Sequence, residues 1–163
     1  MTRFTSLTVA AAVCVSLWST AHAAPPFGNA VPPSPQGTDG VQWQHDLPTA
    51  HKLALTQNKP ILVVFGADWC FYCKKLEKET LSKPDVSKYI NETFIPVHLD
   101  ADKEKKVVKT LKIKGLPCSV VLTPDAKMIG KITGYKQESA YRTELADAEK
   151  NFKLVQTAGR APE

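Results

Sequence analysis

The feature that most constrains the fold is an unbroken apolar run that leads, after a short connection, into a pair of cysteines. Residues 61–65 carry only apolar side chains, which is typical of a strand buried on both faces. Cys70 and Cys73 follow in a stretch up to Leu81 that we expect to be helical. A buried strand that ends where a helix begins predicts an α/β fold and places Cys70 at the helix N-terminus.

The rest of the chain predicts a mixed sheet flanked by helices. The last two expected strands pair as an antiparallel hairpin around Pro124, whereas Pro96 leaves the register of the second strand open. The resulting order is βαβ followed by ββα. We expect helices at residues 47–58, 70–81, 84–90, 102–111 and 138–152, and strands at 61–65, 94–99, 119–122 and 128–133.

The N-terminus has the pattern of a secretory signal peptide. Arg3 precedes an apolar run over residues 7–17, and small residues at positions 21 and 23 favour cleavage after Ala23. The run is shorter than the about 20 apolar residues that span a bilayer, so no stable membrane insertion is expected after cleavage. We therefore expect an exported protein, periplasmic or secreted, with a signal peptide (1–23), a Pro/Gly-rich flexible leader (24–40), a folded domain (41–153) and a polar tail (154–163).

The net charge of +5 excludes little by itself, because the lysines are scattered among acidic residues. No run of basic residues alternates with aromatic ones, as a nucleic-acid-binding surface would require. We expect no nucleic-acid partner.

The spacing of the two cysteines favours redox chemistry. Residues three apart on a helix share one face, with Cβ atoms about 5 to 6 Å apart, which is near enough for a disulfide. Unpaired N–H groups and the helix dipole favour a thiolate in the first turn. We predict that Cys70 is the attacking nucleophile and that Cys73 is the resolving thiol that releases the reduced partner.

Two other interpretations of the pair stay open, namely a structural disulfide and half of a metal site. Zinc usually takes about four ligands, and the chain offers only isolated further Cys and His residues, so no metal or cofactor is expected. Trp69 directly precedes the pair. We interpret it as a contact platform that shields the reactive thiol, although a tryptophan is more often part of a core.

Two segments carry a family resemblance, residues 65–74 (Phe-Gly-Ala-Asp-Trp-Cys-Phe-Tyr-Cys-Lys) and residues 115–117 (Gly-Leu-Pro). They resemble the thioredoxin-like family, in particular the C-terminal thioredoxin-like domain of the bacterial disulfide reductase DsbD, over residues 60–135. The resemblance implies a thioredoxin fold and a cis-proline at Pro117 opposite the dithiol. It also implies that the Leu116 backbone pairs with a bound substrate strand, so Trp69, Leu116 and Pro117 are the predicted substrate-binding residues.

The chain departs from thioredoxins at two positions that handle protons in that family. Val64 and Pro96 stand where thioredoxins carry a buried aspartate and a lysine. Glu77 lies one helical turn after Cys73, and we predict that it accepts the Cys73 proton; the alternative is a solvated glutamate among lysines. Cys118 follows the expected cis-proline and is interpreted as a small buried side chain, with a third redox thiol or a copper ligand as alternatives.

These features predict an exported thiol–disulfide oxidoreductase that acts on protein thiols and disulfides. Phe71 and Tyr72 bring no positive charge between the cysteines, which favours a reductant or an electron relay over an oxidant. A membrane electron donor is a candidate partner. The alternative from another class is a binding, chaperone or metallochaperone module with a structural disulfide.

Overall fold

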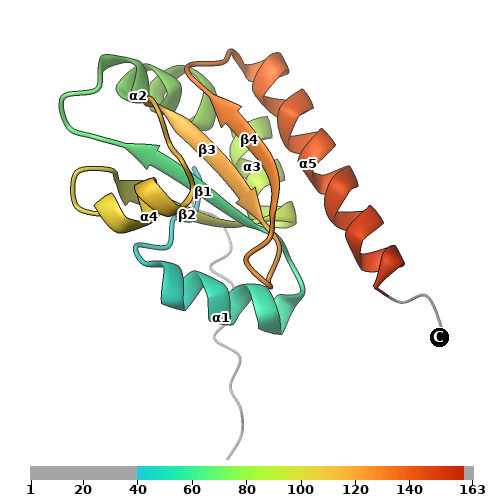
Figure 1. Cartoon of the computed structure of the whole chain (residues 1–163). Coiled ribbons are helices and arrows are strands. Elements are labelled where there is room, and N and C mark those ends of the chain that lie inside the picture. The colour runs from blue at the N-terminus through green and yellow to red at the C-terminus, as the bar shows by residue number, and fades with distance from the viewer. Residues whose placement is uncertain (1–39, 160–163) are drawn as a thin grey trace, which may run out of the picture. The chain divides into compact units, whose positions relative to one another are not determined.

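A computed structural model describes residues 40–159 of the chain (Figure 1). The expected signal peptide, nearly all of the expected leader and the last four residues lie outside the described residues. The elements in chain order are α1 (Leu47–Gln57), β1 (Ile61–Gly66), α2 (Phe71–Leu76), the π-helix η1 (Glu77–Leu81), α3 (Pro84–Thr93), β2 (Ile95–Asp100), α4 (Lys105–Thr110), β3 (Cys118–Leu122), β4 (Met128–Thr133) and α5 (Glu138–Ala158).

The strands form one mixed sheet in the order β2-β1-β3-β4. β1 pairs with β2 in parallel and with β3 antiparallel, and β3 and β4 form the expected antiparallel hairpin. Pro96 is accommodated because β2 is an edge strand whose outer side meets only a short bridge at Gln44. The Gln44 N–H donates to the Pro96 carbonyl at 2.8 Å, so this bridge does not need the N–H that proline lacks. The predicted α/β class and mixed sheet are confirmed.

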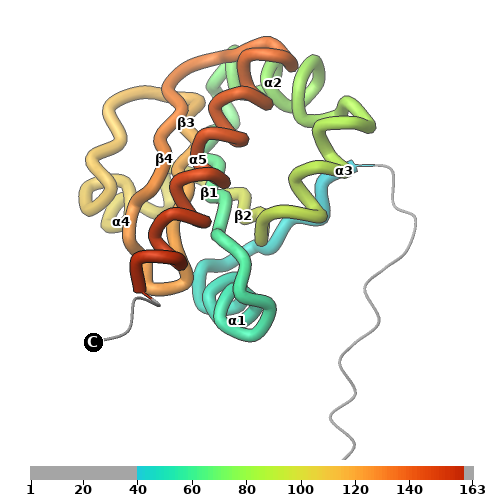
Figure 2. The backbone as a smooth tube through the Cα atoms, turned by 90° about the vertical axis from the view of Figure 1, so that its right-hand side faces the viewer, coloured from blue at the N-terminus to red at the C-terminus, as the bar shows by residue number. Residues whose placement is uncertain are grey.

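Helices cover both faces of the sheet (Figures 1 and 2). On one face, side chains from α2, η1, α3 and α5 pack against the even-numbered residues of β1, Leu62 and Val64. On the other face, α1 and α4 pack against Ile61, Val63 and Phe65. All six residues of β1 are buried, as the apolar run predicts.

The prediction of one continuous α-helix over residues 70–81 is wrong in its second half. After Leu76 the helix widens into a π-helical turn, in which the Ser82 N–H donates to the Glu77 carbonyl at 2.9 Å. Leu76 and Leu81 are five residues apart and would point about 140° apart on an α-helix. The wider turn lets both leucines enter the same core, where each is at most 3% exposed.

The last helix is longer than predicted. α5 continues to Ala158, into the segment expected to be a polar tail. Its buried side chains are Tyr141, Leu145, Ala148 and Phe152. The apolar pattern that predicts the helix therefore stops at Phe152, whereas the helical backbone continues to Ala158. No helix within residues 40–159 has the length and apolar character needed to cross a bilayer.

Candidate active site

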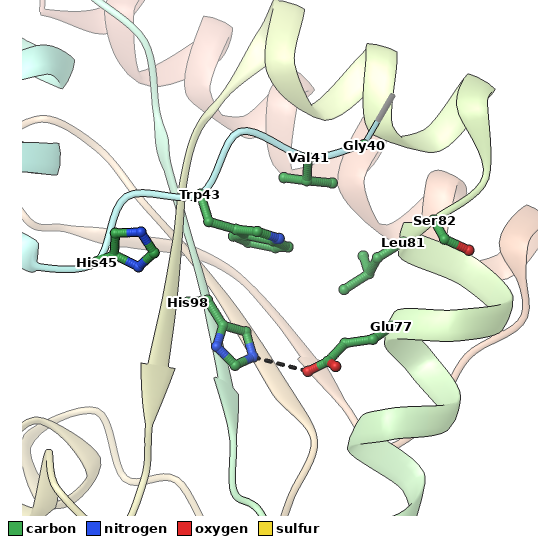
Figure 3. Close-up of a pocket in the computed structure, with 8 residues that line it drawn as sticks. All are labelled: Gly40, Val41, Trp43, His45, Glu77, Leu81, Ser82 and His98. Atoms are coloured by element: carbon green, nitrogen blue, oxygen red, sulfur yellow. Dashed lines mark ion pairs between the residues drawn. The ribbon is translucent and has the colours of Figure 1, made fainter. Parts of the chain in front are cut away.

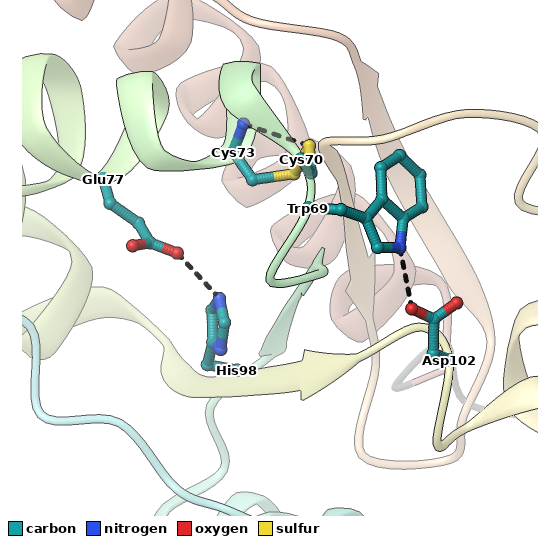
Figure 4. Close-up of a disulfide and its surroundings, with 6 residues drawn as sticks. All are labelled: Trp69, Cys70, Cys73, Glu77, His98 and Asp102. Atoms are coloured by element: carbon teal, nitrogen blue, oxygen red, sulfur yellow. Dashed lines mark hydrogen bonds and ion pairs between the residues drawn. A yellow bond between two sulfur atoms is a disulfide. The ribbon is translucent and has the colours of Figure 1, made fainter.

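The two cysteines of the predicted redox pair form a disulfide at the start of α2 (Figure 4). β1 ends at Gly66, and a turn closed by the Cys70 N–H and the Ala67 carbonyl, at 3.0 Å, leads into the helix. Cys70 is the N-cap residue, so α2 begins one residue later than Cys70. The Cys73 N–H points at the Cys70 sulfur and donates to Sγ at 3.1 Å. The same N–H also donates to the Cys70 carbonyl at 3.2 Å, so it is shared between that carbonyl and the sulfur of the predicted nucleophile.

Exposure does not separate the two cysteines, because Cys70 is 5% and Cys73 is 3% exposed. Their surroundings do separate them. Cys73, but not Cys70, lines a cavity of about 230 Å³ behind the disulfide, which Glu77 and His98 also line. Cys73 therefore faces polar groups that can exchange a proton, as a resolving thiol requires.

Three aromatic side chains adjacent to the cysteines point into solvent. Trp69 is 70%, Phe71 72% and Tyr72 56% exposed. The Trp69 indole N–H donates to Asp102 Oδ2 at 2.8 Å, which fixes the ring beside the disulfide (Figure 4). Trp69 is therefore not a core residue, and the aromatic surface of Trp69, Phe71 and Tyr72 is available to a partner.

Leu116 and Pro117 lie at the same edge of the sheet as the disulfide. β3 runs antiparallel to β1 and begins at Cys118, opposite Phe65, so Pro117 lies beside the connection that leads to Cys70. The Leu116–Pro117 peptide bond is cis. The Pro117 carbonyl accepts from the Gly134 N–H at 2.8 Å, whereas the Leu116 backbone makes no backbone hydrogen bond within residues 40–159.

Cys118 is buried in the sheet, with an exposed fraction of 1%. It packs among the side chains on the α1 and α4 face, together with Phe65 and Val120. Burial raises the pKa of its thiol. These surroundings agree with the interpretation of Cys118 as a small buried side chain. Within residues 40–159 no cluster of three or more metal-binding side chains is present.

Glu77 lies one turn after Cys73, and its N–H donates to the Cys73 carbonyl. Its carboxylate points at a histidine that our sequence analysis considered only as a metal ligand. Glu77 Oε1 and His98 Nε2 are 3.1 Å apart (Figure 4). This nitrogen is buried and makes no well-aligned hydrogen bond, although the side chain of His98 as a whole is 35% exposed.

The register of β1 and β2 explains why His98 reaches the site. His98 lies directly opposite Val64, and registered neighbours in a sheet point to the same face. That face is the one covered by α2 and η1. The sequence carries a weak signal for this placement, because His98 alternates with the buried residues Val97 and Leu99. The same alternation does not predict that Glu77 of η1 is the partner of His98.

A second cavity of about 430 Å³ lies on the other side of the Glu77–His98 pair (Figure 3). Val41 and Trp43 of the segment before α1 line it together with both members of the pair. The Trp43 ring packs edge-on against the His98 ring, with 5.6 Å between centroids. The pair therefore separates this cavity from the one behind Cys73.

A Cys-x-x-Cys disulfide at the start of a helix, on a mixed sheet of this strand order, places the protein in the class of thioredoxin-fold thiol–disulfide oxidoreductases. The sequence profile of the thioredoxin-like domain family matches residues 47–149. The chain belongs to this family, which confirms the resemblance seen in its motifs.

Two curated relatives are bacterial proteins. The chain is 30% identical over 98 residues to the thiol:disulfide interchange protein DsbD of Cronobacter sakazakii, covering 57% of this chain and 17% of DsbD. It is 27% identical over 114 residues to the thioredoxin-related protein DsbJ of Chlamydia pneumoniae, covering 63% of this chain and 33% of DsbJ. The chain thus matches only a minor part of either relative's length.

Solved structures share the fold at low sequence identity. A DsbH oxidoreductase superposes with a TM-score of 0.63 at 20% identity, over 76% of this chain and 94% of that one. The oxidised C-terminal domain of Neisseria meningitidis DsbD superposes with a TM-score of 0.51 at 24% identity, over 63% of this chain and 98% of that one. These similarities establish the thioredoxin fold.

Proposed function

We propose that the protein is an exported thiol–disulfide oxidoreductase that reduces disulfides of other proteins, with Cys70 as the nucleophile and Cys73 as the resolving thiol. The observation that carries this proposal is the position of Cys70 at the N-cap, with the Cys73 N–H directed at its sulfur at 3.1 Å. This N–H can stabilise a Cys70 thiolate in the reduced protein. Cys73 lies inside the helix and lines the cavity that Glu77 and His98 also line.

The reaction consists of two exchange steps. In the first, the Cys70 thiolate attacks one sulfur of the partner's disulfide, and the other partner sulfur leaves as a thiolate. In the second, Cys73 loses its proton and attacks Cys70 Sγ, which breaks the mixed disulfide and releases the second partner sulfur. Two electrons pass from the protein dithiol to the partner, and the Cys70–Cys73 disulfide is the oxidised product.

Glu77 accepts the Cys73 proton in this proposal. Val64 and Pro96 are buried apolar residues and supply no acceptor, whereas Glu77 lines the same cavity as Cys73. Its carboxylate is half exposed, so it can pass the proton on to water. Removing a positioned proton acceptor slows a proton-transfer step by about a hundredfold or more, and solvent access to the site reduces this loss.

Trp69, Leu116 and Pro117 form the partner-binding face. The Leu116 N–H and C=O have no backbone partner in residues 40–159, so both are available to an extended segment of a bound protein. Trp69 and its exposed aromatic neighbours provide apolar contact area beside the disulfide. Recognition of this kind reads backbone more than side chains, which suits a reductant with several protein substrates.

Reduction is the favoured direction because no positive charge lies between the two cysteines. The resemblance of residues 65–74 to the disulfide reductase DsbD supports the same direction, and a membrane protein is a candidate electron donor. The signal-peptide pattern of residues 1–23 supports export, to the periplasm or beyond.

Insulin reduction in the presence of dithiothreitol tests the enzymatic proposal. The wild-type protein should accelerate insulin precipitation, Cys70→Ser should abolish the effect, and Cys73→Ser should accumulate a mixed disulfide detectable by mass. A reduction potential near about −270 mV would support a reductant, and one near about −120 mV would make the protein an oxidant. If the wild-type protein does not accelerate insulin reduction, the alternative of a binding module with a structural disulfide would be favoured.

A further inference from the structure

Glu77 and His98 line the same cavity as Cys73. An alanine at position 66 would place its Cβ 3.3 Å from His98 Nε2 and 3.6 Å from Cys73 Cβ. The histidine nitrogen and the cysteine side chain therefore face the same point above Gly66. Because Gly66 has no side chain, both groups can approach this point.

The buried state of His98 Nε2 points to a function in this cavity. A buried polar nitrogen without an aligned partner costs free energy, and native structures rarely leave one without a reason. The nearest acceptor is Glu77 Oε1 at 3.1 Å. A small movement of either side chain, or a proton shared between them, completes this interaction.

We propose that His98 is a positioning residue for proton transfer at Cys73, and this inference rests on the proposed function. The imidazole holds the Glu77 carboxylate at the cavity wall and shares the proton that leaves the Cys73 thiol. The Cys73 sulfur then attacks Cys70 Sγ, a Cys70–Cys73 bond forms, and the bond from Cys70 to the partner sulfur breaks. The leaving partner thiolate takes a proton from the pair or from water.

His98 occupies this place because of the sheet register. It lies directly opposite Val64, on the face that η1 covers. The Trp43 ring packs against the other side of the imidazole and limits its contact with solvent. A neutral imidazole has one ring nitrogen that accepts a proton and one that donates, so His98 has the chemistry to take up a proton and pass it on.

Other charged groups share the two cavities with His98 and must be considered in any pH profile. The backbone N–H of Asp102 holds the pKa of the Asp100 carboxyl below its ordinary range. The titratable side chains that line one or other of these cavities with His98 are Cys73 and Lys74 of α2, Glu77 of η1, Asp68 before α2, Asp100 at the end of β2, Lys103 after it, and His45 before α1.

The test uses the reduced protein and 5,5′-dithiobis(2-nitrobenzoate) in stopped-flow absorbance. Attack by Cys70 releases one thionitrobenzoate, and resolution by Cys73 releases a second from the same protein molecule. Only the second step requires the Cys73 proton to leave. The first step therefore serves as an internal control for folding and for access to Cys70.

His98→Gln should slow the second step about tenfold and leave the first step within about twofold of wild type. The pH profile of the second step should also differ from that of wild type, because the substitution removes one ionisable side chain from the cavity. His51→Gln is the matched control, since His51 lies on α1 and contacts the Pro124 carbonyl. Glu77→Gln combined with His98→Gln should be no slower than the slower single variant.

An unchanged second step and pH profile in His98→Gln would overturn the inference, and so would equal slowing of both steps. Absence of any two-step release in the wild type would instead contradict the proposed function. If His98→Gln does not fold, NMR of the wild-type imidazole decides the question. In the reduced protein, the His98 ring signals should shift a second time at the pH where the Cys73 thiol ionises. A single step in both redox states would reject the proposal.

Discussion

At the scale of the residue, the site separates the surface that meets a partner from the groups that move a proton. Trp69 lies on the outer side of the disulfide, held by Asp102, and His98 and Glu77 lie on the inner side. The sequence predicts the outer side well because Trp69 is adjacent to the cysteine pair. The inner side depends on contacts between η1 and β2, which local spacing does not encode.

Replacing Trp69 by alanine should lower kcat/KM for a protein disulfide about tenfold, because the partner loses a large, fixed aromatic contact. The second-order rate with a small disulfide such as oxidised glutathione should change less than twofold. Asp102→Asn, which weakens the 2.8 Å bond that orients the indole, should give a smaller loss of the same kind. Equal losses for the protein and the small disulfide would show that Trp69 acts on the thiol instead.

Cys118 should be inert toward alkylation in the folded, reduced protein. Burial raises the pKa of its thiol, so at pH 8 it carries less thiolate than an ordinary cysteine, and its exposed fraction is only 1%. Iodoacetamide followed by mass analysis should modify Cys70 first and modify Cys118 only after denaturation. Labelling of Cys118 in the folded protein at the rate of Cys70 would instead support a third redox thiol.

At the scale of the element, the strands and most helices follow from apolar patterns, and the exceptions have a tertiary cause. Residues 61–65 predict β1 because burial on both faces requires a continuous apolar run. The π-turn of η1 is not predictable in this way. It brings Leu76 and Leu81 into one core, and it places the Thr80 hydroxyl where it donates to the carbonyl of Lys136, between β4 and α5, at 2.8 Å.

The packing of α5 on β4 depends on a close approach at Gly130. A Cβ added there would lie 2.7 Å from the Ala148 Cβ, which is a clash. Gly130→Ala should lower the free energy of unfolding by about 1 to 3 kcal/mol, measured by urea denaturation. Gly115→Ala is the control, because nothing lies within 4 Å of its added Cβ. A loss from Gly130→Ala no larger than the control's would show that α5 shifts without cost.

At the scale of the whole described domain, one buried hydrogen bond joins the last helix to the central sheet. The hydroxyls of Ser119 in β3 and Tyr141 in α5 are 2.8 Å apart, and each residue is at most 1% exposed. This bond holds the helix over β3, the strand that begins beside Pro117. The sequence predicts both elements and cannot predict that these two hydroxyls meet.

Tyr141→Phe should lower the free energy of unfolding by about 1 to 3 kcal/mol, because the Ser119 hydroxyl stays buried without a partner. Adding Ser119→Ala should recover part of this loss, since the double variant leaves no unpaired hydroxyl. Tyr135→Phe is a matched control, because the Tyr135 hydroxyl bonds to Glu79 at the surface and should cost less than about 0.5 kcal/mol. Additive losses in the double variant would contradict the pairing.

The same tyrosine should make the folded domain sensitive to alkaline pH. Burial raises the pKa of Tyr141 above its ordinary value of 10.0, so the folded protein keeps a proton that the unfolded chain releases. Its contribution to stability is complete below pH 10 and is lost as the pH rises toward the raised value. The free energy of unfolding should therefore fall more steeply above pH 10 in wild type than in Tyr141→Phe. Tyr89, whose pKa is also raised by burial, is present in both proteins and cancels in the difference. Parallel pH curves for the two proteins would mean that the buried hydroxyl ionises as readily in the folded domain as in the unfolded chain.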